Sequence, residues 1–436
     1  MSPAARSANL PDVTGARRTL ARSGRAALRN ARVSALFIAA ASEALTVEWA
    51  ARAFLGSSLG LAGFAVATTA IALGNALALA NLTRIARAPA GYRLGRLFLV
   101  GSVAALITGP LLAVVFALLG PLSALGALGA PRVGEVAASS LVAAGGVAVA
   151  VGYGSILWGY AVGQRRVEVD RVELPLPGLA PALEGLRMAQ ISDLHIGLQL
   201  RAPLLRELLA QVNALEPDLV VITGDLFDFD PAFIEEGCRE LAALRAPLGV
   251  YAVLGNHDVY TGVEAVAKGL AEWTQIRVLR DEWTTVEVAG ATLAIAGVED
   301  PGRGWSERDS THDALARLAR ELPADLPRLL LVHRPSYFAE AAQLGFPLAL
   351  AGHTHGGQIA LPGPGRHTNV SRLISRWTRG LFRDESTGAL LYVNRGLGVA
   401  GPPVRLNCAR EISLHRLIAA PREGSAARVV RAVRSA

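Results

Sequence analysis

The sequence predicts an α/β domain preceded by an all-α transmembrane bundle of about four helices. The 436 residues are 52% hydrophobic and only 18% charged, and the apolar excess lies in the first third of the chain. From residue 186 onward, short apolar runs alternate with helical stretches, which is typical of an α/β sheet with covered faces. Late strands at 389–393 and 411–416 indicate a second sheet and therefore a sandwich.

Composition divides the chain into five parts. The first part is basic, with seven Arg and one Asp, and is predicted to be a disordered arm. The five parts are the basic arm 1–32, the transmembrane helical region 33–162, a linker with the first strands 163–185, the α/β domain 186–417, and a basic C-terminal tail 418–436.

Four apolar segments in the first third have about the 20 residues that a membrane-spanning helix needs. They lie near residues 33–55, 59–82, 97–119 and 137–162. The first differs from the others because it contains Glu43, Glu48 and Arg52. Charges are costly in lipid, so we expect these three side chains to face the bundle interior, an interface or a partner.

The distribution of arginine predicts how the bundle is oriented. The arm, the loop 83–96 and the segment that begins at Arg165 are rich in arginine, whereas the other two loops contain only Arg132 and Glu135. With four spans the arginine-rich parts share one side, and the positive-inside rule then puts both termini and the α/β domain in the cytoplasm. An odd number of spans would reverse this orientation.

The order of elements in the α/β domain follows from its apolar runs. Two short alternating strands at 167–169 and 172–174 come first, and prolines then interrupt the chain. The strands predicted next are 186–191, 219–223, 250–254, 329–332 and 348–351, with a hairpin of 284–288 and 293–296 across Ala289-Gly290. The helices predicted between them are 203–214, 232–244, 262–272 and 311–321.

Five polar clusters follow these strands, and they contain five of the eight histidines in the chain. Side chains at successive strand ends converge on one edge of a sheet, so we expect the clusters to lie together. The clusters are Asp193-Leu194-His195, Gly224-Asp225-Leu226-Phe227-Asp228, Gly255-Asn256-His257-Asp258, Val332-His333-Arg334 and Gly352-His353-Thr354-His355.

These residue types suit a pair of divalent metal ions. Two ions about 3.5–4 Å apart can bind a phosphate, activate water and neutralise charge on the leaving oxygen. Such a pair needs a bridging carboxylate, for which Asp225 is the natural candidate after Gly224. The mixture of imidazole and carboxylate favours Mn, Fe or Zn. The candidate ligands are Asp193, His195, Asp225, Asn256, His333, His353 and His355.

The ordered motifs DxH, GDxxD, GNHD, a later His and GHxH resemble the calcineurin-like metallophosphoesterase superfamily, in its bacterial membrane-anchored branch. The tail VNRGLGVAGPPVRL is also similar to that branch, and the resemblance extends from the strand before Asp193 to about residue 417. It implies a four-layer α/β/β/α sandwich and hydrolysis of a phosphate ester, a monoester or a diester, by metal-activated hydroxide.

The resemblance also implies roles for individual residues. One metal would take Asp193, His195, Asp225 and His355, and the other would take Asp225, Asn256, His333 and His353. His257 would act as the general acid or charge stabiliser, oriented by the catalytic partner Asp258.

Five other residues have smaller expected roles. Asp228 is expected to support its loop, and Arg334, next to a ligand, is a candidate phosphate contact. Arg405 in the tail is a further candidate for a substrate contact. Two cysteines form no metal-binding pair, so Cys238 and Cys408 are interpreted as reduced structural thiols.

We therefore expect a membrane-anchored, dinuclear metal-dependent phosphoesterase whose ester substrate is lipid-linked or close to the bilayer. No nucleic-acid partner is expected, because the arginines are scattered and not interleaved with aromatics. No protein partner follows from the sequence. The alternative is a sensor or transport-like membrane protein with a regulated or inactive metal-binding domain. If the bundle only anchors the chain, one unrelated helix should replace all four spans without loss in cells, and turnover would exclude an inactive domain.

Overall fold

The structure is a computed structural model that describes residues 34, 36–85, 89–302, 313–360, 369–373 and 375–420. The chain forms two compact units, Met1–Ser155 and Ile156–Ala436. The predicted basic arm 1–32 and the tail from residue 421 lie outside the described residues.

The first unit is helical. Residues 36–55 form one helix, and α2 (Gly60–Ile85), α3 (Pro89–Ala124) and most of α4 (Pro131–Ala161) follow. Among the described residues, three helical segments are long and apolar enough to cross a membrane: Gly60–Ala80, Arg93–Leu128 and Pro131–Arg165. These three confirm the last three predicted spans, and a span at 33–55 stays a prediction.

The charged residues of the first helix have partners within the helical unit. Glu48 is 7% exposed and accepts hydrogen bonds from Arg52 at 2.6 Å and from the Leu59 amide at 2.8 Å. Glu43 accepts a hydrogen bond of 3.1 Å from the Asn75 side chain. Pairing of this kind reduces the cost of polar groups among apolar helices.

The second unit contains two six-stranded sheets. Their strand orders are β1-β12-β2-β3-β4-β5 and β10-β11-β9-β8-β7-β6. The first sheet comprises β1 (Val167–Leu176), β2 (Arg187–Ile191), β3 (Leu219–Thr223), β4 (Val250–Val253), β5 (Ile276–Val278) and β12 (Arg410–Ala419). The second comprises β6 (Glu282–Val288), β7 (Ala291–Gly297), β8 (Arg328–Leu331), β9 (Leu348–Ala351), β10 (Gly380–Arg383) and β11 (Leu390–Val393).

Most strands that lead into the polar clusters run parallel. Strands β2, β3, β4 and β5 pair in parallel, and so do β7, β8, β9 and β11. Antiparallel pairs occur at β12–β2, at β10–β11 and in the predicted β6–β7 hairpin. Parallel pairing puts the carboxyl ends of neighbouring strands at the same edge of each sheet.

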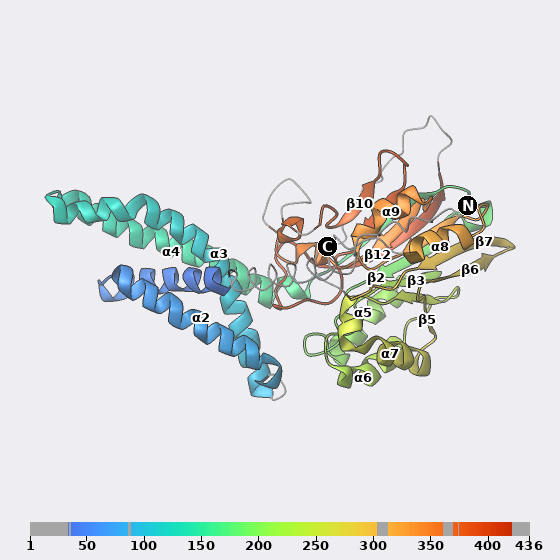
Figure 1. The fold of residues 1–436 in the computed structure, drawn as a ribbon, viewed down its shortest axis with the longest axis horizontal. Coiled ribbons are helices and arrows are strands. Elements are labelled where there is room, and N and C mark those ends of the chain that lie inside the picture. Colours follow the sequence, from blue (N-terminus) through green and yellow to red (C-terminus); the bar gives the residue numbers. More distant parts are fainter. Residues whose placement is uncertain are drawn as a thin grey trace, which may run out of the picture. The chain divides into compact units, whose positions relative to one another are not determined.

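Alternate residues of each strand show how the layers pack. In β3, Leu219 and Val221 face the core between the sheets, whereas Val220 and Ile222 face α5 (Ala202–Asn213), α6 (Ile234–Leu241) and α7 (Asn256–Trp273). In the second sheet, Leu330 faces α8 (Asp313–Glu321) and α9 (Phe338–Gln343). The second unit is therefore the expected α/β/β/α sandwich, with helices outside both sheets (Figure 1).

Three local predictions differ from the structure. The two short strands at 167–169 and 172–174 form one strand, β1, which pairs along its length with β12. The late strands lie in different sheets, β11 in the second and β12 in the first. A short helical piece from Asn256, which contains His257, precedes the helix predicted at 262–272, and a kink at Gly262 separates the two within α7.

Candidate metal centre

The predicted ligands gather where strands of both sheets end. Asp193 and His195 follow β2, and Asp225 follows β3. From the second sheet, His333 follows β8 and His353 follows β9. Three overlapping groups of these residues could each hold a metal ion, because within a group one ligand atom of every residue lies within 4.8 Å of the others. The groups are Asp193, His195 and His355; His195, Asp225 and His257; and Asp225, His333 and His353.

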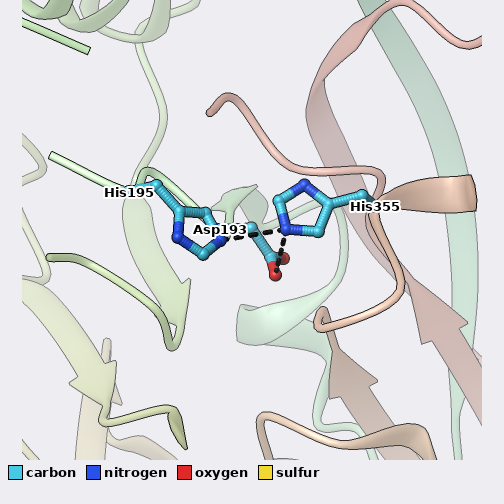
Figure 2. Close-up of side chains that lie close together, drawn as sticks. All are labelled: Asp193, His195 and His355. Atoms are coloured by element: carbon cyan, nitrogen blue, oxygen red, sulfur yellow. Dashed lines mark hydrogen bonds and ion pairs between the residues drawn. The ribbon is translucent and has the colours of Figure 1, made fainter. Parts of the chain in front are cut away.

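The first group joins a carboxylate and two imidazoles that point toward one another (Figure 2). His355 Nε2 lies 2.9 Å from His195 Nε2 and 3.4 Å from Asp193 Oδ1. Two ring nitrogens at this distance need either a proton on one of them or a cation beside both. All three side chains are buried, so solvent does not offset the charge.

The group of Asp225, His333 and His353 is arranged around the carboxylate of Asp225. His333 Nε2 lies 3.1 Å from Asp225 Oδ2, and His353 Nδ1 lies 3.2 Å from His333 Nε2. The His333 Nδ1 nitrogen donates to the Thr223 carbonyl at 2.8 Å, which leaves Nε2 facing the carboxylate. The same Asp225 oxygen lies 3.7 Å from His195 Nε2, so this carboxylate is shared with the group that contains His195 and His257.

Asn256 supplies an independent test of whether these residues fit a cation. Its side chain is 1% exposed, and among the described residues its Oδ1 atom has no hydrogen-bond partner. The neighbouring His257 amide donates to Asp225 Oδ1 at 2.8 Å, which ties this turn to the shared carboxylate. A buried amide oxygen without a partner is costly unless a ligand satisfies it, so the donor set fits metal binding.

Backbone strain is concentrated at these residues. Asp193, His195, Asp225, His353 and His355 all have left-handed backbone, with φ between 48° and 72°. Each such residue costs roughly 1–3 kcal/mol and persists only where the surrounding structure imposes it. These left-handed residues lower local stability, and their side chains point to one place.

Burial and the charges of neighbouring side chains shift the pKa values of the histidines in this site. Burial, together with the neighbouring His195, holds the pKa of His355 well below its usual range, and burial with His333 does the same for the pKa of His353. Burial also opposes the charge of His333, but the Asp225 carboxylate outweighs it and raises the His333 pKa to about 10. His353 and His355 are therefore neutral, as metal ligands must be, whereas His333 holds a proton that a bound metal would displace.

Asp228 holds His257, which corrects the expected role of Asp258. His257 Nδ1 donates to Asp228 Oδ1 at 2.8 Å. Asp258 instead accepts from the amides of Gly255 at 2.9 Å and Phe227 at 2.9 Å. Neighbouring residues on a helix do not face each other, so Asp258 points away from the ring next to it and caps α7. A catalytic part for Asp258 stays a prediction.

The two arginines singled out in the sequence are both buried. Arg334 is 4% exposed, and its Nη2 atom donates to Asp300 Oδ1 at 3.0 Å. A phosphate contact for Arg334 stays a prediction. Arg405 is fully buried and donates to main-chain carbonyls, including Gly398 at 2.7 Å and Arg395 at 2.9 Å. The expected substrate contact of Arg405 is therefore wrong, since its donors are used inside the fold.

Arg405 organises a loop that the sequence reasoning missed as part of the site. In this loop the Gly398 amide donates to the Asp193 carbonyl at 2.7 Å, and the Leu397 amide donates to the Ser192 carbonyl at 2.9 Å. The Cys408 thiol donates to the His355 carbonyl at 3.2 Å. The loop therefore holds the backbone of two predicted ligands, Asp193 and His355. The glycines of the tail motif were the available indication, because they permit this close approach.

Comparison with known proteins identifies relatives of the second unit. The family model described as calcineurin-like phosphoesterase matches residues 186–357. The metallophosphoesterase YkuE of Bacillus subtilis is 31% identical over 294 residues, which are 65% of this chain and 94% of that protein. A transmembrane protein with metallophosphoesterase domain from Bos taurus is 31% identical over 262 residues, 58% of this chain.

A third relative is named for its reaction. It is the UDP-2,3-diacylglucosamine pyrophosphatase LpxG of Chlamydia trachomatis, 25% identical over 322 residues, which are 61% of this chain and 93% of that protein. The chain covers 57% of the length of the Bos taurus relative. The residues matched by the family model, 186–357, include all five polar clusters as far as Gly357.

Proposed function

The chain belongs to the calcineurin-like phosphoesterase family, and from this premise we propose that it is a membrane-anchored, dinuclear metal-dependent phosphoesterase. The observation that carries the proposal is that Asp225 is shared by two groups of candidate ligands, one with His195 and His257 and one with His333 and His353. A carboxylate shared in this way is what a pair of metal ions needs as a bridge.

The proposed ligand sets combine these groups, with Asn256 added and His257 kept for the substrate. One ion would be held by Asp193, His195, Asp225 and His355, and the other by Asp225, Asn256, His333 and His353. When bound, two divalent ions would activate water and neutralise charge on the phosphate. The unpartnered oxygen of Asn256 and the lowered pKa values of His353 and His355 support these sets.

His257 is proposed to give a proton to the leaving oxygen. Its Nδ1 nitrogen is engaged by Asp228, so the Nε2 nitrogen is the one left for the substrate. Asp228 lies in ion-pair reach of both His195 and His257, and those two rings hold its pKa down, to about 2, against the effect of burial. A carboxylate that stays ionised keeps His257 in one orientation and one tautomer.

A lipid-linked or membrane-proximal ester is the proposed substrate. Three apolar helices in the same chain support attachment to a bilayer, and the similar LpxG protein is named for a diacylated substrate. The arginine-rich segments favour a cytoplasmic position of the second unit. A green fluorescent protein fused at the C-terminus tests this position: fluorescence supports it, and a dark but exported fusion contradicts it.

The test of the function is turnover by the full chain in lipid nanodiscs. The metal-stripped protein is assayed with bis(p-nitrophenyl) phosphate and p-nitrophenyl phosphate, with Mn²⁺, Zn²⁺, Mg²⁺ or no metal. We expect hydrolysis only with a divalent metal, and none in the His257→Ala variant. Absence of turnover from folded, metal-loaded protein would favour the alternative, a regulated or inactive metal-binding domain.

A further inference from the structure

Two aromatic side chains beside the metal centre are exposed, which is unusual in this part of the chain. Phe229 is 57% exposed and Tyr260 is 38% exposed. From residue 163 onward, no other large apolar side chain among the described residues is exposed to that degree. Single exposed apolar residues are common, but a pair confined to the mouth of a site indicates a ligand contact.

The two aromatics form one surface with His257. The Phe229 and Tyr260 rings are stacked, with centroids 5.8 Å apart and planes 5° apart. Their centroids lie 4.7 Å and 5.5 Å from that of His257. Phe229 comes from the loop after β3 and Tyr260 from α7, so two separate elements supply the surface, here called the aromatic platform.

Folding alone does not account for Phe229. Its backbone is left-handed, with φ of 56°, a conformation that is unfavourable for a bulky residue and readily adopted by Asn or Gly. Its exposed ring also gains little from burial. A phenylalanine that is strained and exposed lowers stability, so a contribution to function explains its presence better than packing does.

We propose that the aromatic platform binds an aliphatic chain of the leaving group, which makes the substrate an acyl- or alkyl-bearing phosphate ester. This inference rests on the proposed function, because it takes His257 as the proton donor and hence locates the leaving group beside it. The two rings are stacked on each other, so a planar base cannot insert between them. Their exposed faces and edges together form an apolar surface along which an aliphatic chain can pack. The three helices that are long and apolar enough to cross a membrane would keep the chain at the bilayer, where such esters concentrate.

The experiment compares two esters that differ only in chain length. Ethyl phosphate and octyl phosphate, and their methyl diesters, are supplied to the manganese-loaded full chain in nanodiscs, and the released phosphate or alcohol is measured. We expect kcat/KM to be at least tenfold higher for the octyl ester. In Phe229→Asn, which suits the left-handed backbone and so folds, and in Tyr260→Ser, we expect this octyl-to-ethyl ratio to fall to within about twofold of one.

A matched variant distinguishes binding of an aliphatic chain from stacking of a planar ring on the platform. Phe229→Leu keeps an aliphatic surface without a π-face, and we expect it to keep the octyl-to-ethyl ratio within about threefold of wild type. Loss of the ratio in Phe229→Leu to the same extent as in Phe229→Asn would overturn the proposal, because it would show that stacking matters. A wild-type ratio near one, or an unchanged ratio in Phe229→Asn, would also overturn it.

Failure of the proposed function gives a different result. If no ester is hydrolysed with any metal, the phosphoesterase assignment fails. Calorimetric measurement of ester binding then tests whether the aromatic platform binds an aliphatic chain. Tighter binding of octyl phosphate than of ethyl phosphate, abolished in Phe229→Asn and kept in Phe229→Leu, would support the platform. Equal binding of the two esters would overturn it.

Discussion

Two buried polar clusters in the described part of the second unit differ in whether their members satisfy one another. The Arg395 cluster consists of Arg395, Glu411, Tyr392, Asn394 and Ser413. Arg395 donates to Glu411, and Tyr392 donates to the same carboxylate at 2.7 Å, while Asn394 donates to Ser413 at 2.8 Å. In the metal centre, by contrast, two buried carboxylates face imidazoles, and the Asn256 oxygen has no partner among the described residues.

The difference separates groups that stabilise the fold from groups arranged for a ligand. A buried cluster whose members satisfy one another adds rigidity, whereas an unsatisfied one lowers stability until something binds. Substitutions in the Arg395 cluster should therefore reduce stability first, and substitutions in the metal centre should reduce activity first.

The largest expected effect is that of Asp225→Asn on turnover. Loss of the shared carboxylate should lower kcat/KM at least 10³-fold, about 4 kcal/mol of transition-state stabilisation. The amide oxygen can still accept from the His257 backbone, so the metal-free protein should fold, with a thermal midpoint lowered only by loss of the Asp225–His333 ion pair. Turnover within tenfold of wild type would remove Asp225 from the proposed site.

The next largest effect is that of Arg395→Met on stability. It leaves Glu411, which is 1% exposed, with a buried charge that no longer has its cation, at a cost of about 3–5 kcal/mol. The double variant Arg395→Met/Glu411→Gln is the matched control and should recover part of that loss. Chemical unfolding of the solubilised chain measures both, and an unaltered midpoint in the single variant would refute the comparison.

Metal removal should distinguish the two clusters directly. A metal that binds only the folded protein, supplied at 100 times its Kd, raises stability by about 2.7 kcal/mol. The rise in thermal midpoint on adding Mn²⁺ to chelator-treated protein should be present in wild type and Arg395→Met, and absent in Asp225→Asn. An equal rise in all three would mean that the metal binds elsewhere.

The smallest expected effect concerns pH and His415, which lies between the sheets. Its Nε2 nitrogen donates to Gln190 at 2.9 Å, and burial lowers its pKa to about 3, although Glu411 acts in the opposite direction. The unfolded chain, with a His pKa of about 6.5, takes up this proton first as the pH falls. The resulting stability is complete above pH 6.5 and is lost between about pH 6.5 and 3.

His415→Gln tests that assignment. At pH 5.5 the metal-free wild type should have lost about 1 kcal/mol through this group relative to pH 6.5, and the variant should not have lost it. Unfolding midpoints at several pH values measure the difference between the two proteins. Parallel pH profiles for wild type and variant would contradict the buried, neutral state of His415.

The sequence predicted the ligand clusters because each follows a strand, and parallel strands bring such residues to one edge. It did not predict the partner of His257, because Asp258 is adjacent in the chain whereas Asp228 becomes adjacent only when β3 and α7 pack. Arg405 was misread for a similar reason: its carbonyl acceptors come from a loop whose path is set by tertiary contacts. The sheet to which β12 belongs was likewise decided by non-local pairing.

The most direct test of the incomplete cluster is a count of the metal ions that it binds. Full-length protein in nanodiscs is saturated with Mn²⁺, desalted and analysed for bound metal by mass spectrometry. The proposed site predicts two ions per chain in wild type and in Arg395→Met, and fewer in Asp225→Asn. Fewer than two ions in folded wild type, or two in Asp225→Asn, would contradict a dinuclear centre built on this carboxylate.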